Sequence, residues 1–176
     1  RAMIAESGGA QHGMSYDDWG RKYVCHNSSH IELVLFEDRY TARNPYLSAP
    51  NSRVVIAVDG PAADVFRISP VEPWRVVRTR LRVKGITPGI VEGGGKPAGY
   101  FTSATGVTIY RGDAWPEEYR NNAFIGDVGS NLVHRKVMDP DGVSLKAHRP
   151  AGEEKTEFVR SKDIWFRPVQ FSNGPD

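Results

Sequence analysis

The sequence predicts an all-β fold, and two observations support this prediction. Short alternating runs rich in Val, Ile, Tyr and Phe are separated by turn sequences such as DDWG, NSS and VGS, which are the usual signals of strands and hairpins. Evidence for helices is thin, because 12 prolines and 18 glycines interrupt the 176 residues and no amphipathic segment of helical period is evident. Strands are therefore expected to dominate.

Three of the runs repeat one layout. HGMSY (12–16), GVTIY (106–110) and RPVQF (167–171) each alternate and end in an aromatic residue. After the first two runs, YVCHNSSHIELV (23–34) aligns without gaps with FIGDVGSNLVHR (124–135). Repeated meanders of strand, turn and strand are typical of the blades of a β-propeller, so we expect a partial propeller of roughly two to three blades. A single β-sandwich is the structural alternative.

A further strand is predicted at VVRTRLRVK (76–84). In a strand, alternate residues share one face, which here would carry Arg78, Arg80, Arg82 and Lys84. We interpret this row as a solvated outer face above a buried one, with a nucleic-acid-binding stripe as the alternative.

Composition limits the classes of partner. The formal net charge is only +2, from 23 basic and 21 acidic residues, so a whole-surface attraction to nucleic acid or anionic lipid is not indicated. No apolar run reaches the roughly 18 to 20 residues needed to span a membrane. Cys25 is the single cysteine, so the chain contains no internal disulfide and no CxxCH haem attachment motif.

The two ends suggest a segment cut from a longer protein. The chain begins with Arg1 instead of Met and stops at SNGPD, inside a turn sequence. The incomplete third copy of the repeat also suggests that the pattern continues after Asp176. We therefore expect residues 1–176 to be one propeller fragment that is truncated at both ends.

Five segments resemble one family of proteins closely: DRYTARNPYL (38–47), EPWRVVRTRLRVKG (72–85), EGGGKPAGYFTSATGVTIYRGDAWP (92–116), FIGDVGSNLVHRK (124–136) and EFVRSKDIWFRPVQFSNGPD (157–176). They are similar to the propeller region of large planctomycete and verrucomicrobial proteins usually called membrane-bound dehydrogenases. Many of those proteins carry a c-type haem domain elsewhere in the chain. The family is distantly similar to sorbosone and glucose dehydrogenases, which use pyrroloquinoline quinone.

The resemblance implies an exported, periplasmic or otherwise extracytoplasmic oxidoreductase that oxidises a sugar or an alcohol. No cofactor motif is evident in this segment, so pyrroloquinoline quinone is implied only by the resemblance and haem c only for a domain outside it. The implied partners are the small-molecule substrate, the remaining blades and the haem domain. Neither nucleic acid nor a membrane span is expected.

The starts of the aligned runs are the first candidate site. In a propeller the innermost strand of each blade opens toward the central channel, which makes His12, Gly106 and Arg167 equivalent channel-proximal positions. A neutral imidazole can accept the hydroxyl proton of an alcohol, and a guanidinium can hold an oxyanion or a cofactor carboxylate. The related sugar dehydrogenases use a His base in a similar context, so His12 and Arg167 are the predicted catalytic residues, with a structural role for His12 as the alternative.

Two loops supply candidate binding residues. Arg43 and Asn44, in ARNPYL, resemble an Arg-Asn-Pro trio that contacts the cofactor in the quinone enzymes, although a loop-bracing role is the alternative. Glu92 and Lys96 flank a glycine-rich loop, EGGGKP (92–97), which does not have the spacing of a phosphate-binding loop. These two residues are predicted to contact substrate, or to lie in a plain surface turn.

The remaining candidates are aromatic residues and histidines. Trp115 and Trp165 are predicted to stack on a sugar, and the alternative is that they fill gaps between blades, where a large ring buries about 150 to 250 Å². His26 and His30 stand four residues apart, but in a hairpin rather than on a helix, so no metal site is predicted.

Two functions from different classes follow from these residues. The first is an oxidoreductase in which the channel binds a sugar or alcohol and His12 accepts a proton. The second is a non-catalytic propeller module that binds a glycan or another protein domain. Fold alone does not separate them, and the discriminating feature is whether His12 and Arg167 converge with other polar groups on one pocket.

Overall fold

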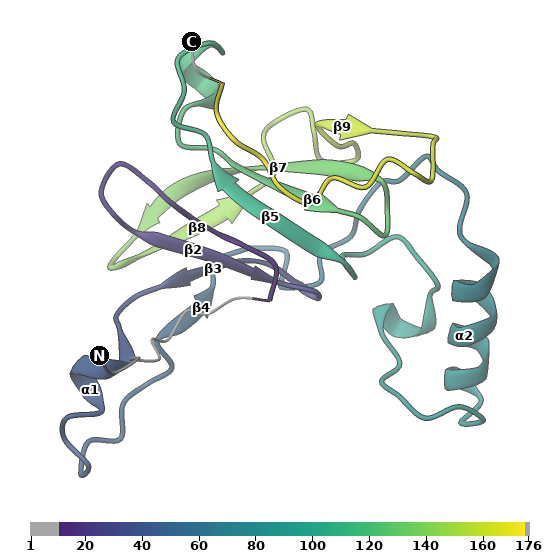
Figure 1. Cartoon of the computed structure of the whole chain (residues 1–176), viewed down its shortest axis with the longest axis horizontal. Coiled ribbons are helices and arrows are strands. Elements are labelled where there is room, and N and C mark those ends of the chain that lie inside the picture. The colour runs from purple at the N-terminus through teal and green to yellow at the C-terminus, as the bar shows by residue number, and fades with distance from the viewer. Residues whose placement is uncertain (1–10, 175–176) are drawn as a thin grey trace, which may run out of the picture.

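The computed structural model describes residues 11–174, and these form two antiparallel sheets with few helices (Figure 1). The first sheet has four strands in chain order: β1 (Met14–Tyr16), β2 (Lys22–His26), β3 (Ser29–Val34) and β4 (Arg53–Val55). The second has five: β5 (Ala104–Ile109), β6 (Ala123–Asp127), β7 (Leu132–Asp141), β8 (Ser144–His148) and β9 (Val159–Arg160), which pairs with β7. The predicted all-β class is confirmed.

The two sheets repeat the layout predicted from the aligned runs, but the alignment holds only as far as the hairpin. The strand at 22–26 corresponds residue for residue to that at 123–127. In the first sheet, however, His26 pairs with Ser29, whereas in the second Asp127 pairs with Leu132. The second hairpin loop is therefore longer, and the gapless alignment of the following strands is wrong.

The main core lies between the sheets. Tyr23 and Cys25 of β2 face the second sheet, where Ala123 and Ile125 of β6 are fully buried. Strand β5 contacts β1, β2 and β3, so the first strand of the second sheet lies across the face of the first. Small and β-branched side chains on this face of β6 permit the close packing of the two sheets.

Two connections project from the sheets in Figure 1. The connection between β3 and β4 carries the short helix α1 (Asp38–Thr41), and the connection between β4 and β5 carries α2 (Pro73–Val83) and the 3₁₀ turn η1 (Gly93–Gly95). A second 3₁₀ turn, η2 (Glu117–Tyr119), lies between β5 and β6. The sequence did not indicate these helices.

The strand predicted at 76–84 is wrong, because these residues belong to α2. Pro73 stands at the first helical position, where its fixed φ favours a helix and its missing N–H is not needed. At the other end, Gly85 has a φ of 69°, and the Ile86 and Gly85 amides donate to the carbonyls of Leu81 and Arg82. This C-terminal glycine motif ends the helix, and arginine itself is a good helix former.

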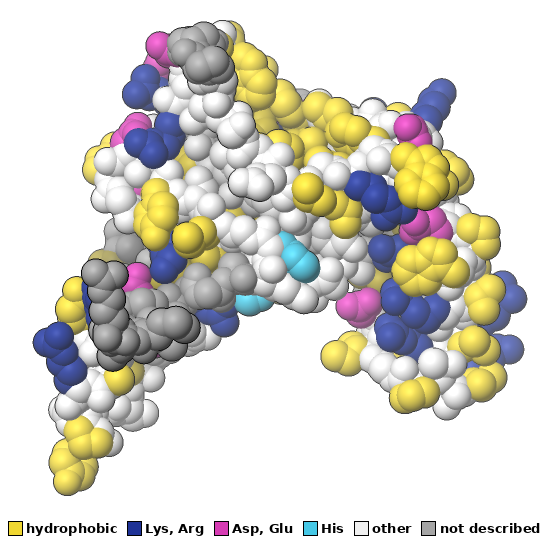
Figure 2. Space-filling view, viewed as in Figure 1, with side chains coloured by type: hydrophobic (Ala, Val, Ile, Leu, Met, Phe, Trp, Pro, Cys, Tyr) yellow, Lys and Arg dark blue, Asp and Glu magenta, His cyan; other side chains and the backbone are white. Residues whose placement is uncertain are grey.

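The helix also removes the predicted row of cations. Residues two apart in a helix point in nearly opposite directions, so the basic side chains spread around α2. Arg78 and Arg82 share one face and border the same small depression, whereas Arg80 and Lys84 border another depression together. Figure 2 shows Lys and Arg side chains over this part of the surface, mixed with apolar ones.

Candidate functional site

The first two aligned runs begin, and the third ends, at one hollow of about 570 Å³, which is lined by residues 11–14, 105–108 and 169–171. The Gly106 amide donates to the carbonyl of His12 at 2.9 Å. The hydroxyl of Thr105 lies 3.3 Å from the same carbonyl and 3.1 Å from that of Val169. Segments separated by more than 150 residues are therefore held together around Thr105.

Glycine makes this close approach possible. Gly106 has a φ of 61°, and a Cβ added to it would lie 2.8 Å from the carbonyl oxygen of Val169. On its other side, the position of a Cβ on Gly13 is 3.4 Å from the backbone of Gly106. Any larger residue at position 106 would push the three segments apart, so this glycine fixes the shape of the hollow.

The chemistry of the hollow is mostly neutral. His12 is exposed there and is the one titratable side chain among the lining residues. Gln11, Thr105, Thr108 and Gln170 add neutral donors and acceptors. Such a set can hold the hydroxyl groups of a polar ligand and offers one imidazole to accept a proton.

Arg167 is not among the residues that line the hollow. Its guanidinium donates to Glu72 Oε1 at 2.8 Å and lies over the ring of Trp165. Glu72 also accepts a 2.9 Å bond from Arg75. Burial alone would raise the pKa of Glu72, but the hydrogen bonds from Arg167 and Arg75 outweigh it and hold the pKa below its ordinary value.

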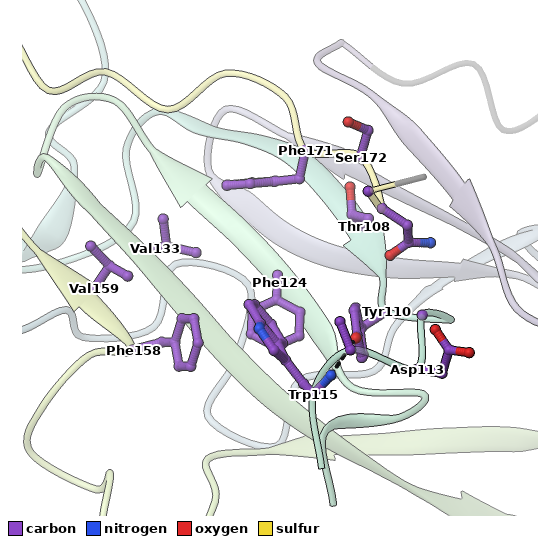
Figure 3. A pocket seen from close by; sticks show the side chains of 14 residues that line it. Thr108, Tyr110, Asp113, Trp115, Phe124, Val133, Phe158, Val159, Phe171 and Ser172 are labelled. Atoms are coloured by element: carbon purple, nitrogen blue, oxygen red, sulfur yellow. Dashed lines mark hydrogen bonds between the residues drawn. The ribbon is translucent and has the colours of Figure 1, made fainter. Parts of the chain in front are cut away.

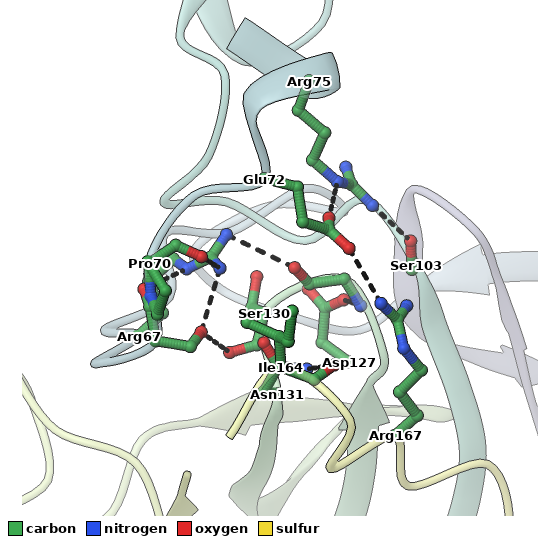
Figure 4. A network of polar contacts seen from close by, with 12 residues as sticks. Arg67, Pro70, Glu72, Arg75, Ser103, Asp127, Ser130, Asn131, Ile164 and Arg167 are labelled. Carbon is green, nitrogen blue, oxygen red and sulfur yellow. Dashed lines mark hydrogen bonds and ion pairs between the residues drawn. The ribbon is translucent and has the colours of Figure 1, made fainter. Parts of the chain in front are cut away.

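This ion pair belongs to a polar network beside the hollow (Figure 4). The guanidinium of Arg75 reaches Ser103, two residues before Thr105. In the turn after β6, Asp127 accepts the Gly129 amide at 2.9 Å, and burial raises the pKa of Asp127. The network ties α2 and the C-terminal segment to the ends of β5 and β6, which is a structural role.

Arg43 and Asn44 lie in the connection after α1 and do not line the hollow. Asn44 accepts the amide of Tyr46 through its side chain at 3.0 Å, and its own amide donates to the carbonyl of Thr41. Arg43 lies over the ring of Tyr40. These contacts brace the loop.

Glu92 and Lys96 also lie away from the hollow. Glu92 borders a small surface depression with Arg78, Arg82 and Tyr100. Its carbonyl accepts the Gly95 amide, and Lys96 is exposed. The structure brings neither residue to the place where His12 lies.

The two tryptophans have different surroundings. Trp165 is 79% exposed and is held by a bond from its amide to Asp163. Trp115 stacks on Tyr110 with ring centroids 4.8 Å apart and borders a cavity of about 440 Å³ on the outer face of the second sheet (Figure 3). Phe124, Phe158 and Phe171 also line this cavity, so its walls are aromatic.

A buried polar cluster between the sheets was not predicted from the sequence. His30 of β3 and His134 of β7 are fully buried, and His30 stacks on Phe101 at 4.3 Å. One ring nitrogen of His30 bonds the carbonyl of Pro61 at 2.7 Å, and one of His134 bonds Glu157 at 2.6 Å. The sequence holds one clue to this cluster, because charged residues within an apolar run suggest that they are buried together with polar partners.

Lys136 completes this cluster. Its ammonium group is buried and lies 2.6 Å from both carboxylate oxygens of Asp59, 77 residues away in the chain. Burial lowers the pKa of Lys136. Burial, followed by the charges of His134 and Lys136, lowers the pKa of His30 to about 3, so this imidazole is neutral at pH 7.

Within residues 11–174, no three or more His, Cys, Asp or Glu side chains gather in a way that could hold a metal ion. In the same range no helix has the length and apolar character needed to cross a membrane.

The fold and the hollow define the class of this protein: an all-β chain in which an antiparallel meander is repeated, with the repeats joined at their first strands. The chain belongs to the DUF7133 family, a domain of unknown function whose model matches residues 1–176. Neither a curated protein nor a solved structure matches the chain.

Proposed function

We propose that the two sheets are neighbouring blades of a β-propeller and that residues 167–171 are the first strand of a third. Three observations support this fold. The sheets repeat one strand order, the first strand of one lies across the other, and all three runs border one hollow. In a propeller the innermost strands surround a central channel, and the hollow has the position of such a channel wall.

We further propose that this channel binds a sugar or an alcohol in an oxidoreductase, and that His12 accepts the hydroxyl proton of the bound substrate while the hydride on its carbon passes to a two-electron acceptor held by another part of the parent protein. The observation that carries this proposal is the exposed imidazole at the meeting point of the three runs. General bases of this kind act within hydrogen-bonding reach of the proton. The family resemblance supplies the substrate class and the extracytoplasmic location, which both stay predictions.

Among the described residues, the lining of this hollow lacks the cations that pyrroloquinoline quinone would need. The cofactor carries three carboxylates, which call for cationic partners, and neither Lys nor Arg is among the lining residues. Arg167, the predicted partner for such a charge, is paired with Glu72. The proposal therefore assigns to these residues substrate binding and proton acceptance, and it leaves Arg167 out of the site.

Electron transfer to haem c is likewise assigned to a part of the protein other than this chain. The only cysteine, Cys25, is buried, and the sequence has no CxxCH motif for covalent attachment of haem. The haem domain stays a prediction of the resemblance.

A binding module without catalysis is the second candidate. It is favoured by the neutrality of the hollow, where one imidazole stands among amide and hydroxyl groups. Neutral groups of this type suit the recognition of a glycan, whereas an oxidation site needs further groups to position and activate the substrate.

One experiment separates the two functions. The intact protein is assayed for dye-linked oxidation of a panel of sugars and alcohols, and binding of the same compounds is measured by calorimetry. We expect His12→Ala to lower turnover by about 10²-fold or more and His148→Ala, at a partly exposed histidine in β8, to leave it unchanged. Binding that needs His12 without any turnover would instead establish the module. Unchanged oxidation in His12→Ala removes this residue from the mechanism.

A further inference from the structure

The outer face of the second sheet is an apolar surface that the described residues cover only in part. Tyr110, Phe124 and Val133 form its buried centre, while Trp115 remains 43% exposed and Val159 39% exposed. The cavity of about 440 Å³ lies over this centre. Figure 2 shows hydrophobic side chains gathered along the upper edge of the molecule, over this sheet.

The repeat identifies this face. In the first copy, Tyr23 and Cys25 point to the face that the second sheet covers. The corresponding residues of the second copy, at the same positions of the matching strand, are Phe124 and Gly126. Phe124 points to the aromatic side, so the outer face of the second sheet is the counterpart of a face that is already an interface in this molecule.

The C-terminal segment, residues 167–171, covers part of this outer face of the second sheet. In the observed interface the backbone of Val107 lies against the thiol of Cys25. On the outer face, the carbonyl of Pro168 lies 2.6 Å from the position of a Cβ on Gly126. Pro168 aligns with Val107 in the repeat, since Phe171 aligns with Tyr110. Residues 167–171 therefore occupy the place that β5 occupies on the first sheet.

One chain segment covers less than a whole sheet does. On the first sheet, β5 is accompanied by β6, β7 and β8, whose Ile125, Leu132 and Leu145 complete the core. On the outer face, Phe158, Phe166 and Phe171 pack against the centre and leave the aromatic cavity open beside Trp115. Exposed aromatic side chains around an apolar hollow mark an interaction surface.

We infer that this outer face docks a further antiparallel sheet of the same repeat, which extends residues 167–171 as its first strand and places small aliphatic side chains against Phe124 and Trp115. The inference rests on the proposed propeller, but not on its ligand or on oxidation. The occupant is a sheet rather than a small molecule, because continuity with the observed interface fixes both the register and the direction of packing.

The test is cysteine labelling on the intact protein as its own cell makes it. Val159→Cys places a thiol at the cavity on the outer face, and Val143→Cys places a control thiol in the β7–β8 turn, where the native side chain is 92% exposed. The native Cys25 is buried, and the unsubstituted protein gives its background. We expect maleimide to label the thiol at 159 at least about tenfold more slowly than the thiol at 143.

Each outcome decides the inference. Equal labelling of the two positions means that the face is open and overturns it. Protection at 159 that disappears on dilution means that a second copy covers the face, which also overturns it. Protection that is independent of concentration supports the docked sheet, and cross-links from position 159 to alternate residues of one segment establish that a strand is seated there. Failure of the His12 assay leaves all of these outcomes unaffected.

Discussion

Protonation of His30 at low pH should lower the free energy of unfolding, because this histidine lies between the two sheets. The imidazole is fully buried between β3, Phe101 and His134, and burial, followed by the charges of His134 and Lys136, lowers its pKa from the ordinary 6.5 to about 3. In the unfolded chain the same group takes up a proton near pH 6.5. The unfolded state therefore binds more protons below that pH, so the stabilisation is complete above pH 6.5 and is lost as the pH falls toward 3.

The size of the effect follows from the shift. Between pH 7 and pH 5, a histidine with these two pKa values lowers the free energy of unfolding by about 2 kcal/mol. Burial also lowers the pKa of His134, which acts in the same direction. The carboxylates of Asp59 and Glu157, whose pKa values lie below the ordinary range, stay ionised in this interval. Burial raises the pKa of Asp127 and Glu153, but both carboxylates are shared by a His30 variant and the unsubstituted protein, so the comparison of the two isolates His30.

The assay is denaturant unfolding at pH 7, 6 and 5, followed by circular dichroism. We expect His30→Phe to keep the ring stack on Phe101 and to be less stable at pH 7, since the hydrogen bond from the imidazole to the carbonyl of Pro61 is lost. Its free energy of unfolding should nevertheless fall less steeply with pH than that of the unsubstituted protein. His12→Phe, at an exposed position, is the matched control. Equal slopes for His30→Phe and the unsubstituted protein would refute the reasoning.

Two further predictions concern single contacts. Asp59→Ala leaves the ammonium group of Lys136 buried without its partner, so we expect a loss of about 3 to 5 kcal/mol in the free energy of unfolding, and recovery of much of it when Lys136→Met is added; no recovery would show that the pair is not the cause. Gly106→Ala should destabilise the protein more than Gly142→Ala, because both glycines have a φ near 60° but only the first meets a neighbour, the carbonyl of Val169. Thermal unfolding compares the two variants, and equal losses would contradict the close approach at the hollow.

Much of the sheet structure was predictable, and the reason is local. Strands at 22–26 and 123–127 follow from alternating apolar residues between turn sequences, and a period of two is visible without knowing the neighbours. Helix α2 was not predictable in this way. Its Arg and Val residues alternate as they would in a strand, and only Pro73 and Gly85 marked the ends of a helix.

The candidate site was predictable in part. The repeat predicted that the starts of all three runs lie close together, and the structure brings residues 12, 106 and 169–171 to one hollow, whereas Arg167 is not among its lining residues. It did not reveal that Arg167 turns toward Glu72, because the direction of a long side chain depends on partners from distant parts of the chain. The pairing of Lys136 with Asp59 was hidden for the same reason.

The sequence by itself determined the class of the fold and the order of the repeated strands, because hydrophobic period and turn residues act over a few positions. Tertiary structure alone decided which polar groups are buried together and which apolar face stays open. His30 and His134 lie 104 positions apart, and their rings meet edge to face only because one sheet packs on the other. Contacts of this kind depend on the docking of whole sheets, and no local pattern records them.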